Sequence, residues 1–274
     1  MNFERDVATT TAMTSIQPSP MNRKTVLRGR DHPGLGAKTI ARIGPSLAVA
    51  MTAGVRPKAP PAVDPNEDMG AVVRGPRADL LVVADGHFGR EASELAVDHV
   101  LDAIGDDPPP ADLTDDELVT VFFDAGVAVQ RELGRPGCPH PESRTTLTLA
   151  LVADDAVQWA AIGDSCVVLA STAGGARLDE PRNTYLGYRF SFTEVAAALT
   201  RGRAAWNSGN CLVLATDGLV DAVAVGELDV AAVVSRELGS AADAARAAET
   251  LLHLAVAEEA DDAVTIAVAA TPPA

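Results

Sequence analysis

Residues Leu80 to Gly89 read Leu-Leu-Val-Val-Ala-Asp-Gly-His-Phe-Gly, an apolar run of strand length that ends in a carboxylate, a glycine and a histidine. A strand buried on both faces has this unbroken apolar pattern. The pattern returns at Cys211 to Gly218, which read Cys-Leu-Val-Leu-Ala-Thr-Asp-Gly. The sequence therefore predicts two buried strands that each end in a carboxylate, Asp85 and Asp217.

Composition limits the partners that this chain can have. The 274 residues include 38 acidic and 22 basic side chains, a formal net charge of -16. Most of such a surface repels a nucleic-acid backbone and an anionic membrane, so neither is predicted as a partner. The charge suits a protein that concentrates cations, and a hydrophobic fraction of 47% is enough for a substantial core.

Cysteine usage and the amino-terminal sequence indicate the compartment. Three cysteines with no C-x-x-C pair favour a reducing environment. The first residues lack the order of a secretory signal, and no apolar run approaches the roughly 18 residues of a membrane span. We expect a cytoplasmic protein.

Apolar periodicity predicts separate runs of strands and helices. Strands are predicted near residues 46–55, 80–84, 145–152, 156–162, 166–170 and 211–215 and after Asp262, and helices at 90–104, 115–133, 192–199, 230–238 and 241–258. Thr114 and Glu117 predict a capping box for the second helix. This order favours an α+β fold. Residues 1–44 are predicted to form an irregular arm and residues 45–274 one domain.

Acidic residues recur at the predicted strand ends. They are Glu67 with Asp68, Asp85, Asp164, Asp217, and Asp261 with Asp262. A carboxylate at the end of a buried strand is costly unless it is paired, solvated or bound to a cation. Nearby arginines are too few to pair all of them, so a divalent cation is the simplest explanation. Oxygen ligands with one nearby histidine point to Mg²⁺ or Mn²⁺ rather than zinc.

Each of these motifs taken alone has a plainer explanation. Asp-Gly is a common turn dipeptide, and a lone histidine such as His87 is more often structural than catalytic; only its place two residues after Asp85 makes the two interpretations equal. The functional interpretation is favoured because each acid adjoins an apolar run, a position that a surface turn does not need.

Six motifs follow one another in order between Leu47 and Val268. They are Asn66-Glu67-Asp68, Ala84-Asp85-Gly86-His87-Phe88-Gly89, Thr145-Thr146, Ile162-Gly163-Asp164-Ser165, Ala215-Thr216-Asp217-Gly218-Leu219 and Asp262-Ala-Val-Thr265. Together they resemble the motifs of the PPM-type (type 2C) metal-dependent protein serine/threonine phosphatases. The resemblance implies a four-layer α-β-β-α sandwich of two antiparallel sheets flanked by helices, with a metal cluster at one edge.

The resemblance also implies a role for each acidic motif. Asp85 would bridge two Mn²⁺ or Mg²⁺ ions, and the carbonyl of Gly86 would bind one of them. Asp217 and Asp262 would complete the ligands of the other. The remaining implied residues are Glu67 and Asp68 on metal-bound waters, Asp164 at a third, weaker metal, and His87 as general acid for the leaving alkoxide.

One position departs from the family pattern. An arginine that grips the substrate phosphate usually stands four residues before the glutamate, where this chain has Val63. Gly54-Val55-Arg56 looks like the usual Gly-x-Arg followed by an insertion, so Arg56 is the candidate phosphate-binding residue. An equally good interpretation makes Arg56 a solvated charge at a strand end.

The predicted function is hydrolysis of phosphoserine and phosphothreonine in a phosphoprotein, by a metal-activated water at a dinuclear site. One alternative is a weak or inactive relative that binds phosphoproteins, which the valine at position 63 motivates. Another is a phosphohydrolase with Asp85 as nucleophile. Such enzymes usually carry Asp-x-Asp, whereas here the second position is His87.

Overall fold

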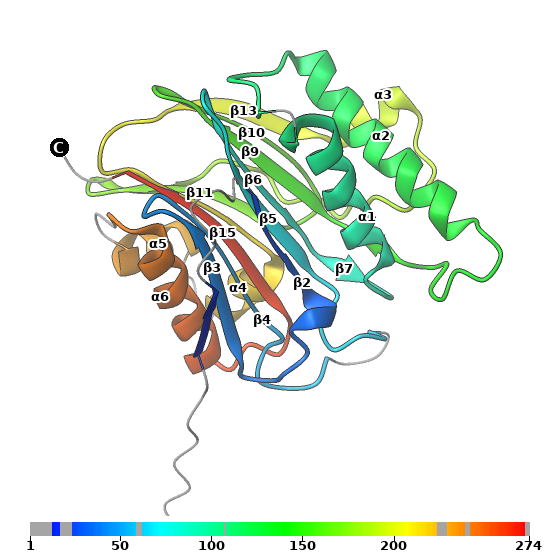
Figure 1. Cartoon of the computed structure of the whole chain (residues 1–274), viewed down its shortest axis with the longest axis horizontal. Helices are drawn as coiled ribbons and strands as arrows, with labels where there is room; N and C mark the ends of the chain where they lie inside the picture. Colours follow the sequence, from blue (N-terminus) through cyan, green and yellow to red (C-terminus); the bar gives the residue numbers. More distant parts are fainter. Residues whose placement is uncertain are drawn as a thin grey trace, which may run out of the picture.

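Two stacked β-sheets form the centre of the molecule, with helices on both outer faces (Figure 1). The computed structural model describes residues 13–16, 24–58, 62–106, 108–223, 229–238 and 242–271. The expected α+β sandwich is confirmed. None of the helices in the described ranges has the length and hydropathy needed to cross a membrane.

One sheet has seven strands among the described residues. In spatial order they are β1 (Met13–Ile16), β3 (Lys38–Ile43), β4 (Leu47–Thr52), β15 (Val264–Ala270), β14 (Cys211–Ala215), β11 (Cys166–Ser171) and β12 (Gly174–Arg177). All neighbours in it are antiparallel except β1 and β3, which are parallel.

The other sheet is antiparallel throughout its six described strands. Their order is β13 (Thr200–Ala205), β10 (Ala156–Ile162), β9 (Leu147–Val152), β6 (Asp79–Ala84), β5 (Met69–Arg74) and β2 (Lys24–Arg28). A short pair, β7 (Gly86–His87) and β8 (Arg144–Thr145), extends β6 toward the first helix.

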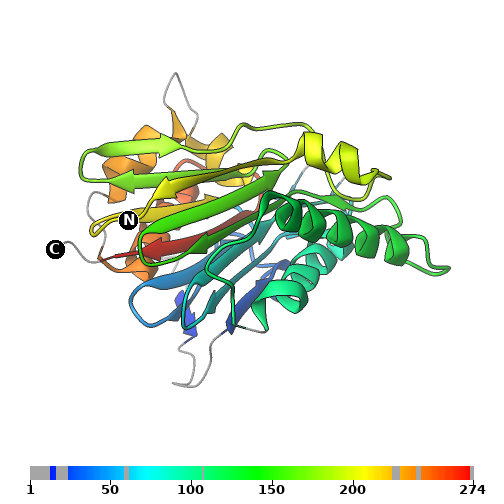
Figure 2. The ribbon, with the colours of Figure 1, turned by 90° about the horizontal axis from the view of Figure 1, so that it is seen from above.

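Helices cover the outer face of each sheet. Those on the six-stranded sheet are α1 (Glu91–Val100), which continues as a π-helical turn (Leu101–Gly105), α2 (Asp115–Leu133) and α3 (Phe192–Ala198). Those on the seven-stranded sheet are α4 (Asp217–Val223), α5 (Val230–Leu238) and α6 (Ala244–Ala257). A 3-10 turn (Gly29–Asp31) follows β2. Figure 2 shows α1 and α2 side by side, in agreement with their contacts.

Strand β6 shows why its sequence is apolar without a break. Leu80, Val82 and Ala84 pack with the helices on the outer face, whereas Leu81 and Val83 pack against the other sheet. Successive side chains of a strand point to opposite faces, so a strand between two apolar layers needs apolar residues at every position. Strand β6 therefore lies between two apolar layers, one formed with the helices and one formed with the other sheet.

Local signals located several elements well. The structure has the predicted helices at Asp115–Leu133 and Val230–Leu238 and the strand at Ala156–Ile162. The capping box is present, because Thr114 accepts the N–H of Glu117 and the Glu117 side chain accepts the N–H of Thr114. The strand β13 was not predicted, since Thr200–Ala205 contains arginine, glycine and alanine rather than an apolar run.

The predicted irregular arm over residues 1–44 needs correction. Lys24–Arg28 and Lys38–Ile43 are strands of the two sheets, so the folded domain begins before residue 45. Both strands are short and mix charged with apolar residues, so they lack the sustained period by which a strand is recognised from sequence. Residues 1–12 and 17–23 of the predicted arm lie outside the described residues.

Candidate metal centre

Asp85 follows directly on β6 and is 1% exposed. Its backbone is fixed by two neighbours: its N–H donates to Thr146 Oγ1 at 2.9 Å, and its carbonyl accepts from Thr145 Oγ1 at 2.7 Å. These contacts explain the Thr-Thr motif. Neither carboxylate oxygen of Asp85 has a hydrogen-bond partner among the described residues. The backbone of Asp85 is thus fixed, while both of its carboxylate oxygens lack a hydrogen-bond donor among the described residues.

Asp164 and Asp217 meet Asp85 from two other parts of the chain. One carboxylate oxygen from each of the three lies within 4.8 Å of the others. Asp217 begins α4, directly after the second buried strand, β14. Asp164 follows β10 in a turn that Gly163 makes with a φ of 111°. The strand ends therefore bring together three of the acids that the sequence singled out.

Buried oxygens without partners define the site. Five of those in the described chain belong to this cluster: Oδ1 of Asp68, both Oδ atoms of Asp85, Oδ1 of Asp164 and Oδ1 of Asp217. Burial raises the pKa of Asp85 well above its usual value, and the charges of Asp217 and Asp68 raise it further. Burial also raises the pKa of Asp68 and of Asp217. Mutually repelling, desolvated carboxylates fit Mg²⁺ or Mn²⁺, since these ions bind oxygen ligands.

Thr216 supports this cluster from behind. Its hydroxyl donates to Asp68 Oδ2 at 3.1 Å and accepts the N–H of Thr265 at 2.9 Å. Because α4 starts at the next residue, Thr216 ties Asp68 to the segment that carries Asp217. Hydrogen bonds of this kind orient the ligands of a metal.

We expect Thr216→Val to lower Mn²⁺ affinity by about tenfold or more, because Asp68 loses its orienting hydrogen bond. Isothermal titration calorimetry measures the affinity. The matched control is Thr148→Val in β9, which removes a buried hydroxyl that has no partner among the described residues. Equal Mn²⁺ affinity in the wild type and Thr216→Val would contradict the prediction.

Glu67 lies at the site but is occupied with backbone groups. Its Oε1 accepts N–H groups of Val63 at 3.0 Å, Asp64 at 3.2 Å and Gly89 at 2.7 Å. Gly86 packs against it so closely that a Cβ there would lie 2.1 Å from the Glu67 carbonyl oxygen. The glycine of the Asp-Gly motif is therefore required by this close approach.

His87 lies beside Asp85, with Nε2 3.7 Å from Asp85 Oδ2. Its ring meets Tyr185 edge to face, with centroids 4.9 Å apart, and the Tyr185 hydroxyl donates to Asp164 at 2.8 Å. Burial lowers the pKa of His87 below its usual value, against the opposing charge of Asp217. The next residue, Phe88, has a φ of 61°, a backbone conformation uncommon for a side chain of this size and often found at functional sites.

Lys58 is the cation nearest the acids and was not predicted. Its side chain is 7% exposed, and Nζ lies 2.6 Å from Asp262 Oδ1. Burial lowers its pKa, but the charges of Asp85, Asp68, Glu67 and Asp217 outweigh this, so that the net shift is upward. The only sequence signal was a lysine in the proline-rich loop before the Glu-Asp pair.

Arg56, the predicted phosphate-binding residue, is not among the residues that line the cavity beside the acids. It forms an ion pair with Glu259, and the two side chains are 58% and 66% exposed. Val63, in the position of the family arginine, is 52% exposed. Of the two cations in this loop, the structure brings Lys58 and not Arg56 to the carboxylates.

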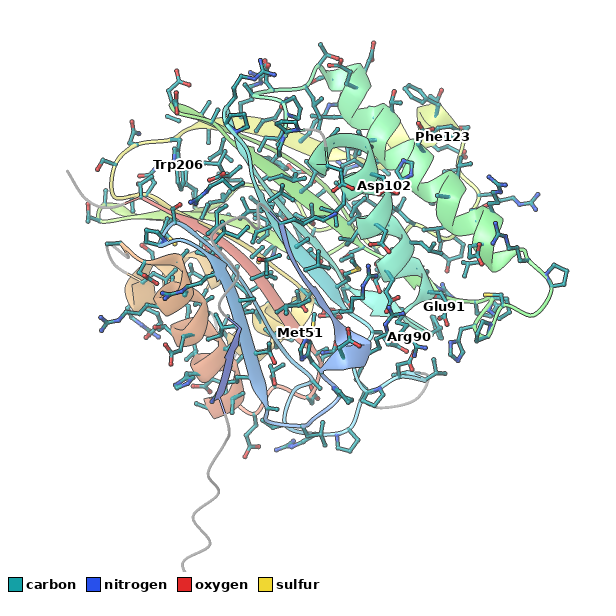
Figure 3. The ribbon with its side chains drawn as sticks, viewed as in Figure 1. Met51, Arg90, Glu91, Asp102, Phe123 and Trp206 are labelled. Atoms are coloured by element: carbon teal, nitrogen blue, oxygen red, sulfur yellow. The ribbon has the colours of Figure 1, made fainter. Side chains whose placement is uncertain are left out.

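A cavity of about 320 Å³ opens beside these groups, lined by Lys58, Ala62, Glu67, His87, Phe88, Asp261 and Asp262. A larger cavity of about 470 Å³ contains Asp79 and Trp206 in its lining. Asp79 begins β6 and Asp85 follows its end, so the two cavities lie at opposite ends of that strand. Figure 3 shows Trp206 at the end of the sheets away from Arg90 and Glu91, which follow the Gly89 turn.

Comparison with known proteins gives one family and a set of solved structures. Residues 62–262 match the family model described as protein phosphatase 2C. The catalytic domain of the serine/threonine protein phosphatase PstP in complex with two manganese ions is 24% identical, with a TM-score of 0.63, over 82% of this chain and 98% of that chain. Stp1 from Staphylococcus aureus is 18% identical, with a TM-score of 0.65, over 83% and 95%. None of the curated proteins compared matches this chain.

Proposed function

Because the chain belongs to the protein phosphatase 2C family, we propose that it hydrolyses phosphoserine and phosphothreonine in proteins at a dinuclear Mn²⁺ or Mg²⁺ centre. The observation that carries the proposal is the group of partnerless, buried carboxylate oxygens on Asp68, Asp85, Asp164 and Asp217. The PstP structure with two manganese ions has the same fold. The metals, when bound, supply an activated water and positive charge for the phosphoryl oxygens.

The proposed ligands adjoin five strands, β5, β6, β10, β14 and β15. Asp85 would be shared by both metals, with the Gly86 carbonyl on one, and Asp217 and Asp262 on the other. Asp68 and Glu67 would hold metal-bound waters. For Glu67 only the oxygen other than Oε1 serves this role, because Oε1 already accepts three N–H groups. Asp164, held by Tyr185, would serve a third site.

His87 and Lys58 are the proposed groups for the substrate itself. His87 borders the cavity and would donate a proton to the leaving alkoxide of serine or threonine. An imidazolium whose pKa is lowered by burial is a stronger acid than one in water. Lys58 lines the same cavity and would hold a phosphate oxygen. The alternative of an inactive relative was motivated by the valine at position 63, where the family usually has a phosphate-binding arginine. In this proposal Lys58 takes the place of that arginine.

The arrangement does not favour Asp85 as a nucleophile. Asp85 lies among Asp68, Asp164 and Asp217, so a phosphate ester that approached the Asp85 carboxylate for attack on its phosphorus would meet three further negative charges. A metal centre removes that repulsion and needs no protein nucleophile.

The direct test is turnover of p-nitrophenyl phosphate with Mn²⁺, with Mg²⁺ and with chelator. We expect turnover with at least one metal and its loss in chelator. Undiminished turnover in chelator would contradict a metal mechanism. Metal binding by calorimetry without turnover would favour a phosphoprotein-binding regulator instead.

A further inference from the structure

An aromatic pocket lies beside the candidate metal centre, and we propose that it docks a large apolar side chain of the substrate polypeptide, next to an acidic residue. This inference rests on the proposed phosphatase function and names the substrate class of the same site. The aromatic pocket has a volume of about 240 Å³, and its lining includes Phe123 and Val127 of α2 and Leu186, Tyr188, Arg189 and Phe190 of the segment after Tyr185.

The surface around the aromatic pocket is unusually apolar for this chain. Among the described residues five large hydrophobic side chains are exposed, and three of them lie here: Val127 at 49%, Tyr188 at 47% and Phe192 at 41%. Phe192 packs edge to face on Phe123 of α2, which is labelled in Figure 3, with ring centroids 5.7 Å apart. Apolar side chains gathered around a concave site mark a binding surface more often than scattered ones do.

The aromatic pocket is continuous with the metal centre through one short segment. Tyr185 donates to Asp164 and touches His87, and the next residue, Leu186, lines the pocket. Leu186 also exchanges backbone hydrogen bonds of 2.9 and 2.8 Å with Thr145, whose hydroxyl donates to the Asp85 carbonyl. The segment from Tyr185 to Leu186 therefore connects the aromatic pocket to the metal centre.

Arg144 joins the two sites on the surface. Its guanidinium lies 4.4 Å from the ring centre of Phe88 and 4.8 Å from that of Tyr188. This stacking holds the arginine in place and leaves its N–H groups available. Neither Arg144 nor Arg189 forms an ion pair with any described residue, so both guanidinium groups are free to meet an acidic residue of a bound polypeptide. Two unpaired cations beside an apolar pocket fit an acidic residue beside an apolar anchor.

The probes are synthetic phosphothreonine peptides that carry one leucine or phenylalanine at each successive position around the phosphothreonine, in a glycine-serine background. At the best position, the wild type is expected to have a kcat/KM about tenfold higher for the peptide with leucine or phenylalanine than for the peptide with alanine at that position. This is the effect of burying one such side chain. An adjacent aspartate is expected to increase the preference, and Arg189→Glu to reverse that increase. Equal kcat/KM for all peptides would overturn the proposal.

Val127→Asp tests the aromatic pocket directly, because it places a charge in it from an exposed position on α2. Its apolar preference should disappear while turnover of p-nitrophenyl phosphate is unchanged. The matched control is Leu35→Asp, an exposed apolar residue at 46% outside this pocket, which should keep the preference. Retention of the preference in Val127→Asp would overturn the assignment.

Two further readouts separate this proposal from the proposed function. Absence of p-nitrophenyl phosphate turnover in the wild type would contradict the proposed phosphatase function. Fluorescence anisotropy of labelled peptides in chelator would still measure peptide docking in that case. Weaker peptide binding by Val127→Asp would then support the aromatic pocket. Sedimentation that shows a dimer in the wild type and a monomer in Val127→Asp would assign the pocket to a second copy of the chain and overturn the proposal.

Discussion

Asp85→Asn is expected to reduce metal-dependent turnover of p-nitrophenyl phosphate by about 10³-fold or more, which corresponds to roughly 4 kcal/mol of transition-state stabilisation. Asp85 lies in one cluster with Asp164 and Asp217, and both of its carboxylate oxygens lack hydrogen-bond partners in the described chain. An amide of the same shape offers one neutral oxygen and no charge to a metal. Steady-state kinetics at saturating Mn²⁺ measure the loss.

In the absence of metal, Asp85→Asn should be more stable than the wild type, although it is less active. Burial and neighbouring acids raise the pKa of Asp85, so the folded protein binds this proton more tightly than the unfolded chain does. The free energy of unfolding therefore falls as pH rises from about 4 through the raised pKa. Asp85→Asn removes this loss. In chelator at neutral pH its Tm should exceed that of the wild type, by about 2–4 °C for each 1 kcal/mol of relieved repulsion.

The matched control for Asp85→Asn is Asp79→Asn, at the other end of β6. Burial raises the pKa of Asp79 as well, but Arg74 lies 3.5 Å from it, away from the metal centre. Asp79→Asn should keep turnover and the increase of Tm with Mn²⁺. If Asp85→Asn retained turnover, or still showed an increase of Tm with Mn²⁺, Asp85 would no longer be a proposed ligand.

Lys58→Met has the second-largest expected effect: kcat/KM should fall by about 10- to 100-fold, the value of one charge-assisted hydrogen bond of about 1.5–3 kcal/mol. Without metal this variant should also unfold at lower temperature, since Lys58 is the cation that faces the buried acids. Mn²⁺ should bind it more tightly than the wild type, because no ammonium group competes for Asp262. Kinetics, thermal unfolding in chelator and calorimetry test the three effects separately.

Arg56→Met is the matched control, because both cations come from the same loop. Its ion pair with Glu259 is exposed, and exposed pairs contribute little. We expect kcat/KM to stay within about twofold of the wild type, and Lys58→Arg to retain most of the activity. A larger loss in Arg56→Met than in Lys58→Met would return the phosphate-binding role to Arg56.

Sequence patterns were sufficient for the parts of this protein that local interactions determine. The apolar run before Asp85 defined a strand buried on both faces, and Thr114 with Glu117 defined a helix start. The family motifs selected the acids, three of which meet within 4.8 Å. The strands at Lys24–Arg28 and Lys38–Ile43 escaped detection because neither has a sustained apolar period of its own. Lys24–Arg28 is held by pairing with Met69–Arg74, and Lys38–Ile43 by pairing with Met13–Ile16 and Leu47–Thr52.

The sequence by itself determined which acids are the candidate ligands, because residue type can be read directly and the acids adjoin predicted strands. Only the tertiary structure decided which cation faces those acids. Arg56 and Lys58 are two residues apart in a proline-rich loop, and the direction in which each points depends on packing against Glu259 and Asp262, about 200 residues away in the chain. The aromatic pocket has the same origin, since α2 and the segment after Tyr185 form it together only in the folded molecule.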